Sequence, residues 1–182
     1  MDGSKRSTHG NAYFTGLGRH KRIVFFDTLV DTLAIDELQA VLAHELGHFR
    51  LRHVSLRLAV SLAAAFAGFA LLAWLGNQSW FQPALGVPAG GSHTLLLLFV
   101  LAAPVFLFPL RPLSAGLSRR HEFAADRFAA QHANGGALAD ALVKLYRDNA
   151  TTLTPDPLYA AFHASHPPAL ARIARLAPGR AG

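Results

Sequence analysis

The sequence predicts a mainly α-helical protein with a small N-terminal β-hairpin and an inserted hairpin of two apolar helices. Three observations lead to this prediction. Residues 36–53 have helical character, with acidic residues in the first turn. Two long runs without a charged residue follow, at 58–75 and 94–110. Two short β-prone runs precede them, at 11–14 and 22–26, separated by glycines and polar residues.

The remaining elements are also helical in pattern. A short helix is expected at 28–33, before the long one. After the second apolar run, helices are expected at 117–132, 137–147, 158–164 and 168–176, with Gly135 and Gly136 ending the first of these. We expect all of this to form one domain over residues 1–182, into which the apolar hairpin is inserted.

Composition narrows the class of protein. The chain has 182 residues, of which 52% are hydrophobic and only 15% charged, an apolar balance for a soluble protein. It has no cysteine, so disulfides and thiolate metal ligands are excluded. A net charge of +6 suits nucleic acid or an anionic membrane surface. Because the arginines flank apolar runs and no nucleic-acid motif is present, we expect a lipid bilayer as partner and no nucleic acid.

The two apolar runs have the length of membrane helices. They contain 18 and 17 residues, and the second includes Pro104 and Pro109, which membrane helices tolerate. Trp74 and Trp80 lie near the connecting segment, where aromatic residues often mark a bilayer interface. The alternative is a hairpin of two buried core helices in a soluble peptidase. In a domain this small, little other chain remains to cover such a hairpin, so we favour the membrane.

Charge predicts the orientation of the hairpin. The segment that connects its two helices, 76–93, contains no Lys or Arg. Arginines instead flank its two outer ends, namely Arg50, Arg52, Arg57, Arg111, Arg119 and Arg120. By the positive-inside rule, both outer ends lie on the cytoplasmic side. We therefore expect an integral membrane protein, in a bacterial cytoplasmic membrane, with residues 44–48 at the cytoplasmic face.

The run His44-Glu45-Leu46-Gly47-His48 has the pattern H-E-x-x-H. On a helix, residues four apart share a face, so His44 and His48 can bind one metal ion. Glu45 lies close enough to act on a metal-activated water. The pattern is typical of zinc peptidases. The alternative is a surface helix with two solvated histidines.

A catalytic zinc usually takes three protein ligands and keeps one position open. Glu122 and Asp126 are the strongest candidates to complete the site, because they are four apart on the predicted helix 117–132. A Glu ligand followed one turn later by an Asp that orients a ligand His is the gluzincin pattern. The alternative for both carboxylates is solvated pairing with arginines such as Arg119 and Arg120. The predicted hairpin leaves and returns to one membrane face, which would bring Glu122 to the H-E-x-x-H motif.

Four segments in this order resemble a known family. They are NAYFTG at 11–16 with KRIVFFDTL at 21–29, HELGH at 44–48, Glu122 to Asp126, and His166-Pro167-Pro168 with Arg172. The chain resembles the C-terminal catalytic portion of the integral-membrane zinc metallopeptidases typified by the CAAX prenyl endopeptidases. The first segment is closer to these than to the related HtpX-type quality-control proteases. The resemblance implies a gluzincin-like zinc peptidase core.

The resemblance also implies roles for individual residues. One Zn²⁺ per chain would be held by His44, His48 and Glu122, with Glu45 as general base and Asp126 orienting a ligand His.

Further from the metal, Asn11 and His166 would contact the substrate backbone or the tetrahedral intermediate, and Arg172 would support His166. The other histidines considered are interpreted as structural or solvated, namely His53, His121 and His163.

The expected activity is hydrolysis of peptide bonds near the C-terminus of prenylated or membrane-associated peptides. Family members carry additional N-terminal membrane helices that enclose an intramembrane chamber. This chain lacks them, so we expect a fragment or a reduced relative, and the chamber wall needed to recognise a prenyl group is incomplete. Two alternatives remain open: an HtpX-like membrane quality-control protease, and a non-catalytic membrane protein with a structural metal site.

Overall fold

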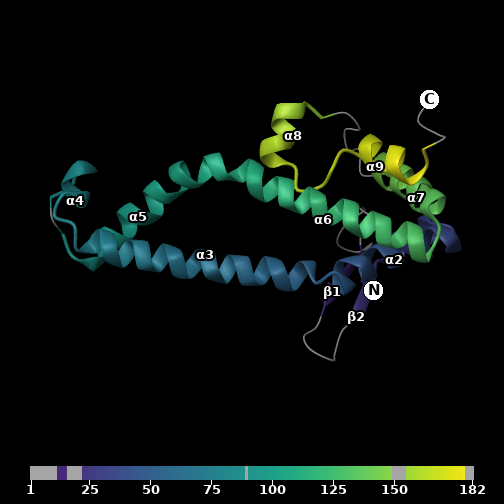
Figure 1. Ribbon diagram of the computed structural model, residues 1–182, viewed down its shortest axis with the longest axis horizontal. Helices are drawn as coiled ribbons and strands as arrows, with labels where there is room; N and C mark the ends of the chain where they lie inside the picture. Colours follow the sequence, from purple (N-terminus) through teal and green to yellow (C-terminus); the bar gives the residue numbers. More distant parts are fainter. Residues whose placement is uncertain (1–11, 16–21, 89, 149–154, 179–182) are drawn as a thin grey trace. The chain divides into compact units, whose positions relative to one another are not determined.

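The structure, a computed structural model, describes residues 12–15, 22–88, 90–148 and 155–178 (Figure 1). It is mainly α-helical, as predicted. The chain divides into two compact units, one formed by residues 1–53 with 114–182 and the other by residues 54–113. The second unit is thus inserted in the sequence of the first. That the whole chain forms one domain remains a prediction.

The N-terminal β-hairpin is confirmed. Strands β1 (Ala12–Thr15) and β2 (Arg22–Phe25) pair antiparallel, with Ala12 opposite Phe25 and Thr15 opposite Arg22. The described strand β1 extends one residue beyond the predicted run 11–14, whose first residue lies outside the described residues, and β2 ends one residue before the end of the predicted run 22–26. Helix α1 (Asp27–Thr32) follows directly, and its Leu29 is buried in the core.

Three helices pack together in the first unit: α2 (Ile35–Arg50), α7 (Gly135–Asp148) and α9 (Ala169–Leu176). The core they share is rich in alanine, which lets helix backbones approach closely. Its buried residues are Leu29, Leu33, Ala40, Val41, Ala43, Ala129, Ala137, Leu138, Ala141 and Leu142. Buried Glu37 links two of the helices, because its Oε2 accepts from Ala34 N at 2.7 Å and from Lys144 Nζ at 2.7 Å.

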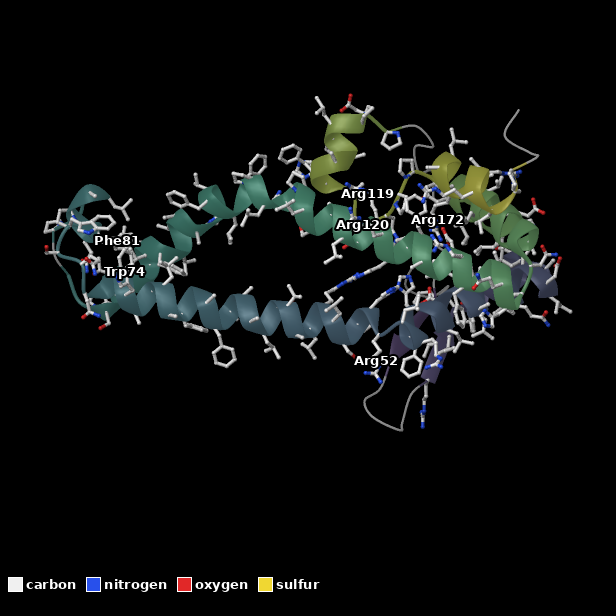
Figure 2. All side chains as sticks on the ribbon, in the orientation of Figure 1. Arg52, Trp74, Phe81, Arg119, Arg120 and Arg172 are labelled. Atoms are coloured by element: carbon white, nitrogen blue, oxygen red, sulfur yellow. The ribbon has the colours of Figure 1, made fainter. Side chains whose placement is uncertain are left out.

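The long N-terminal helix ends earlier than predicted. We expected it to run to His53, but α2 ends at Arg50 and α3 (His53–Gly76) begins at His53. Between them Arg52, labelled in Figure 2, has a φ of 57°, in the left-handed region. This conformation costs an L-residue about 1–2 kcal/mol. A glycine at this position would have indicated the break between α2 and α3, because glycine favours the left-handed region, whereas an arginine gives no such indication.

The helices after the hairpin also differ from the prediction at their ends. Helix α6 (Arg111–His132) begins earlier than expected, directly after the short 3₁₀ helix η2 (Phe108–Leu110). Gly135 and Gly136 begin α7 and do not end α6. The reason is Asn134, whose Oδ1 accepts from Gly136 N at 2.9 Å and from Ala137 N at 3.2 Å and so caps α7.

Helix α8 (Pro157–His163) is capped in the same way at its N-terminus. The N–H of Tyr159 donates to Asp156 Oδ1 at 2.8 Å. The last two predicted helices, α8 and α9, are thus confirmed to within a residue or two.

The second unit is an apolar helical hairpin. It contains most of α3, the short helix α4 (Phe81–Ala84) and α5 (Ser92–Leu107), and α4 was not predicted. Trp74 and Phe81 lie at the end of the hairpin that carries α4 (Figure 2). The contact between α3 and α5 is close at Gly76, where a Cβ would lie 2.8 Å from Leu95 Cδ2.

Both long helices meet the length and composition required to cross a membrane. They are His53–Gly76 and the continuous run Ser92–His132, and only 6% and 0% of their most apolar windows are buried. Large apolar side chains therefore face outward, such as Phe66 at 74% and Phe106 at 76% exposure. This does not fit the alternative of a buried core hairpin, whose side chains would be covered, and it fits a lipid environment.

Helix α2 lies close to α6 at Gly47. A Cβ at this position would lie 3.1 Å from both Ala125 Cα and Phe128 Cβ. A methyl group here would require its neighbours to shift by a few tenths of an ångström, and the backbone of α6 gives way less easily than a flexible side chain. The glycine therefore sets the distance between the helices that carry H-E-x-x-H and Glu122.

We predict that Gly47→Ala lowers the free energy of unfolding by about 1–3 kcal/mol, because α2 and α6 must move apart. Gly116→Ala is the matched control on α6: its Cβ would meet only Arg119 Nη2, at 3.8 Å. That variant should be stabilised by up to about 1 kcal/mol through helix propensity. Denaturation of both variants in detergent measures the difference, and equal stabilities would contradict a tight crossing at Gly47.

Candidate metal centre

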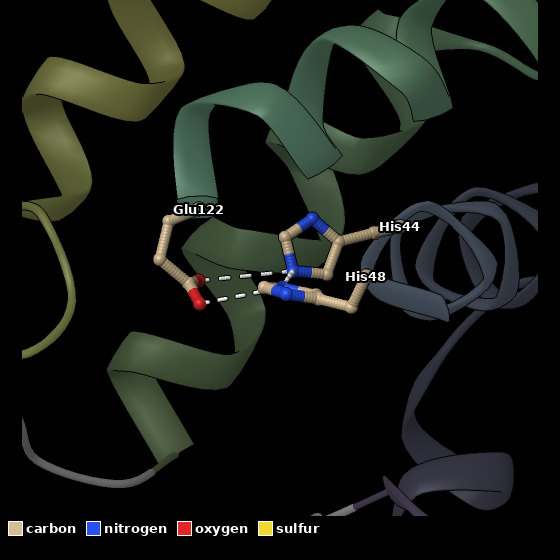
Figure 3. A group of neighbouring side chains, drawn as sticks. All are labelled: His44, His48 and Glu122. Atoms are coloured by element: carbon tan, nitrogen blue, oxygen red, sulfur yellow. Dashed lines mark hydrogen bonds and ion pairs between the residues drawn. The ribbon is translucent and has the colours of Figure 1, made fainter. Parts of the chain in front are cut away.

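Three predicted metal ligands converge between α2 and α6 (Figure 3). His44 and His48 lie one turn apart on α2, and their Nε2 atoms are 3.2 Å apart. From α6, Glu122 directs Oε1 to within 3.3 Å of His48 Nε2 and Oε2 to within 3.7 Å of His44 Nε2. His44 and Glu122 are buried, at 7% and 5% exposure.

These distances fit one tetrahedral metal ion. Zinc bonds of about 2.0–2.1 Å at tetrahedral angles separate neighbouring donor atoms by about 3.3–3.4 Å. One donor atom from each of the three residues lies within 4.8 Å of the others. Two imidazoles and a carboxylate are also a donor set that zinc favours, and the chain has no cysteine to compete. The residues therefore fit the ion that the sequence implies.

The other ring nitrogen of His44 contacts a carboxylate. His44 Nδ1 lies 2.9 Å from Asp126 Oδ1. Asp126 in turn accepts two hydrogen bonds from Arg172, from Nη2 to Oδ1 at 2.6 Å and from Nε to Oδ2 at 2.8 Å. When Nδ1–H donates to Asp126, Nε2 carries the lone pair that a metal requires. The predicted alternative of a solvated Asp126 is wrong, because Asp126 is 3% exposed.

The two buried carboxylates remain ionised. Burial alone raises the pKa of Glu122, but hydrogen bonds with His166 and His48 outweigh it and hold this pKa far below that of an ordinary carboxyl group. The pKa of Asp126 is likewise lowered: burial opposes ionisation, and hydrogen bonds from His44 and Arg172 outweigh it. The site thus presents negative charge to a cation.

Arg119 holds α8 and does not pair with Glu122. Its Nη1 donates to Ala160 O at 3.0 Å and to Ala164 O at 2.9 Å, at the C-terminal end of α8 (Figure 2). These bonds tie Arg119 to the C-terminal end of α8, where Ala160 O also accepts from Ala164 N at 3.1 Å. They also anchor the segment that leads to His166, whose Nδ1 lies 2.9 Å from Glu122 Oε2. His166 is thereby beside the ligand set, with its side chain 64% exposed.

A cavity of about 590 Å³ adjoins this side of the site. It is lined by both apolar and polar residues of α7, α8, α9 and the segments between them. They are Leu142, Leu145, Tyr146, Pro155, Tyr159, His163, Ala164, Ser165, His166, Pro167, Pro168 and Arg172. Sequence reasoning missed Tyr146, which lies on an amphipathic helix without a motif. Burial raises the pKa of Tyr146, so its phenol stays a neutral hydrogen-bond donor.

The other predicted site residues are placed as follows. Glu45 is half-buried on α2, next to His44. Arg172 is 5% exposed and bonds to Asp126, with Nη1 3.6 Å from Glu122 Oε2. Its support of His166 remains a prediction. Asn11 lies outside the described residues.

Sequence reasoning also missed a contact of His53. We expected a structural or solvated residue, and His53 is 6% exposed with Nδ1 3.1 Å from Nδ1 of His48. Its ring stacks on that of His121, with centroids 4.1 Å apart and an interplanar angle of 9°. On a continuous helix, residues five apart, such as His48 and His53, do not share a face. The break at Arg52 makes the contact, and no pattern in the sequence signals that break.

Comparison with known proteins identifies the family of the chain. Residues 1–178 match peptidase family M48. The chain is 36% identical over 192 residues to CAAX prenyl protease 1 of Saccharomyces cerevisiae, covering 97% of this chain and 42% of that protein. It is 39% identical over 178 residues to the Arabidopsis thaliana homolog, covering 95% and 41%. The crystal structure of S. mikatae Ste24p matches with a TM-score of 0.83 at 35% identity, covering 97% and 44%.

Two facts qualify the likeness. The chain spans less than half the length of the curated relatives it matches. These relatives are eukaryotic, so the comparison gives no support to the bacterial source that we expected. The match to the family nevertheless extends over nearly all of the chain, and the H-E-x-x-H motif lies within it. The chain belongs to peptidase family M48.

Proposed function

We propose that this chain is the zinc-binding catalytic portion of a membrane endopeptidase. One observation carries the proposal. The imidazoles of His44 and His48 and the carboxylate of Glu122 converge at the donor distances of a tetrahedral metal site, and Asp126 contacts the outer ring nitrogen of His44. Within the described part of the chain, the cluster contains three ligands. Three ligands leave a fourth position for chemistry, which favours a catalytic site over the alternative of a closed structural one.

Zinc, when bound here, supplies a Lewis acid that polarises the scissile carbonyl and lowers the pKa of water. The chain's own residues do the rest. Glu45 acts as general base and then passes the proton to the leaving amine. His166 is exposed beside Glu122, in reach of a substrate, and stabilises the oxyanion that develops. The cavity beside His166 accepts the peptide, and Asn11 contacts its backbone.

For the substrate, we propose prenylated or membrane-associated peptides that are cut near the C-terminus. The names of the relatives in yeast and Arabidopsis support this class over quality-control proteolysis. The outward-facing apolar side chains of α3 and α5 support a site held at a bilayer surface. The charge-free linker and flanking arginines support a cytoplasmic active site.

Glu122→Gln should raise the zinc dissociation constant more than about 100-fold, which exceeds the usual effect of losing a residue that only hydrogen-bonds to a ligand. The substitution replaces a charged carboxylate ligand with a neutral amide, which is a poor ligand for zinc. Asp36→Asn, an exposed carboxylate on α2, is the control and should bind zinc as wild type does. Metal content after dialysis against a chelator reports the result, and unchanged zinc in Glu122→Gln would place the third ligand elsewhere.

Glu45→Gln should retain zinc and lose peptide cleavage by about 10²–10⁴-fold, the contribution expected of a general base. The same Asp36→Asn control should keep full activity. Zinc content and turnover are measured on one preparation, so that metal loss is separated from loss of the base. Cleavage at the wild-type rate by the zinc-loaded Glu45→Gln protein would rule out this mechanism.

Substrate class is tested with a prenylated peptide and an unprenylated peptide of the same sequence. We expect kcat/KM to be at least about tenfold higher for the prenylated one, since the lipid adds apolar contact area and holds the peptide at the membrane. Detergent-solubilised and vesicle-embedded protein should both be assayed. Equal rates on the two peptides in vesicles would favour a protease without lipid selectivity.

A further inference from the structure

The two histidines of the proposed metal centre have different outer partners. His44 Nδ1 contacts the carboxylate of Asp126, at 2.9 Å. His48 Nδ1 contacts another imidazole, with His53 Nδ1 at 3.1 Å. The second contact is largely sheltered, because His53 is 6% exposed and the side chain of His48 16%.

A contact between two ring nitrogens has one donor and one acceptor. When His48 donates through Nδ1–H, its Nε2 carries the lone pair, and this Nε2 lies 3.2 Å from His44 Nε2 and 3.3 Å from Glu122 Oε1. The opposite tautomer would put an N–H at the point where the ligands meet. An acceptor at His53 Nδ1 therefore favours the tautomer of His48 that can bind a metal.

His53 is held in place from two sides. On one side its ring lies parallel to that of His121, which precedes Glu122 on α6, with centroids 4.1 Å apart. On the other, Arg52 takes the left-handed conformation that brings the start of α3 back to His48. A backbone conformation that costs about 1–2 kcal/mol persists only where surrounding contacts offset it.

We propose that His53 is a positioning residue that fixes the tautomer and ring orientation of His48. This inference rests on the proposed metal site. It gives the two ligand histidines different outer partners. His44 contacts Asp126, which is paired with Arg172, and His48 contacts the imidazole of His53, which stacks on His121. The acceptor on His53 is the feature that matters, and the stack on His121 only holds it.

Three variants separate the acceptor from the packing. His53→Phe keeps a ring to stack on His121 and removes the acceptor. His53→Asn keeps an acceptor at the place of Nδ1 and removes the ring. His121→Phe keeps the stack and leaves the contact between His53 and His48 intact. Each is made in the full chain, purified in detergent and stripped of metal.

The zinc dissociation constant, measured by competition with a chelator, should rise about 10–100-fold in His53→Phe, the usual effect of losing an outer-shell partner. His53→Asn and His121→Phe should stay within roughly threefold of wild type. The visible absorption of bound Co²⁺ should change in His53→Phe alone. Thermal unfolding of the metal-free proteins shows whether a variant is merely misfolded.

Zinc affinity within roughly threefold of wild type in His53→Phe would overturn the proposal, as would equal losses in all three variants. Nitrogen-15 NMR of the zinc-loaded wild-type protein tests it without any variant. A proton on Nδ1 of His48 is expected, and zinc coordination through Nδ1 would contradict the role of His53. A wild-type chain that binds no zinc would refute the metal site itself, whereas Glu122-dependent binding that His53→Phe leaves unchanged refutes this inference alone.

Discussion

The close crossing of α2 and α6 at Gly47 is the contact on which the rest of the site depends. The ligands lie far apart in sequence, on two different helices, and their side chains converge only when the helix backbones approach closely. Ala43 on α2 and Ala125 on α6 are both buried. The donor distances of 3.2–3.7 Å therefore depend on this backbone packing.

Charge is then arranged around this crossing. Bringing carboxylates out of water is costly unless each one is paired. Asp126 is paired with Arg172, and Glu122 lies near His166, His48 and Arg172. The buried arginine comes from α9, at the end of the chain, so α9 must dock before the site is complete. Folding of this unit and assembly of the site are therefore coupled.

The sequence predicted which residues meet at the candidate metal site better than it predicted the connections between helices. The three candidate ligands could be proposed from their spacing and from the resemblance, because residues four apart on a helix share a face, and the structure brings these residues together. The apolar hairpin could also be predicted, because two long runs without charged residues indicate it directly. What escaped prediction depends on backbone conformations that the residue types do not signal. Because Arg52 takes a left-handed conformation, α2 ends early and His53 contacts His48. Because Asn134 caps α7, Gly135 and Gly136 begin this helix, whereas they were expected to end the preceding one. Tyr146 was missed because only the packing of α7 and α9 brings it to the cavity.

The central claim is that this crossing holds one metal ion through two imidazoles and one carboxylate and leaves a position open. X-ray absorption at the zinc edge of the wild-type protein, loaded with one equivalent of zinc, tests this most directly. We predict a four-coordinate zinc with only nitrogen and oxygen neighbours at about 2.0–2.1 Å, and multiple scattering from two imidazoles. Three or four imidazoles around the metal would contradict the account, because a further histidine would then close the site.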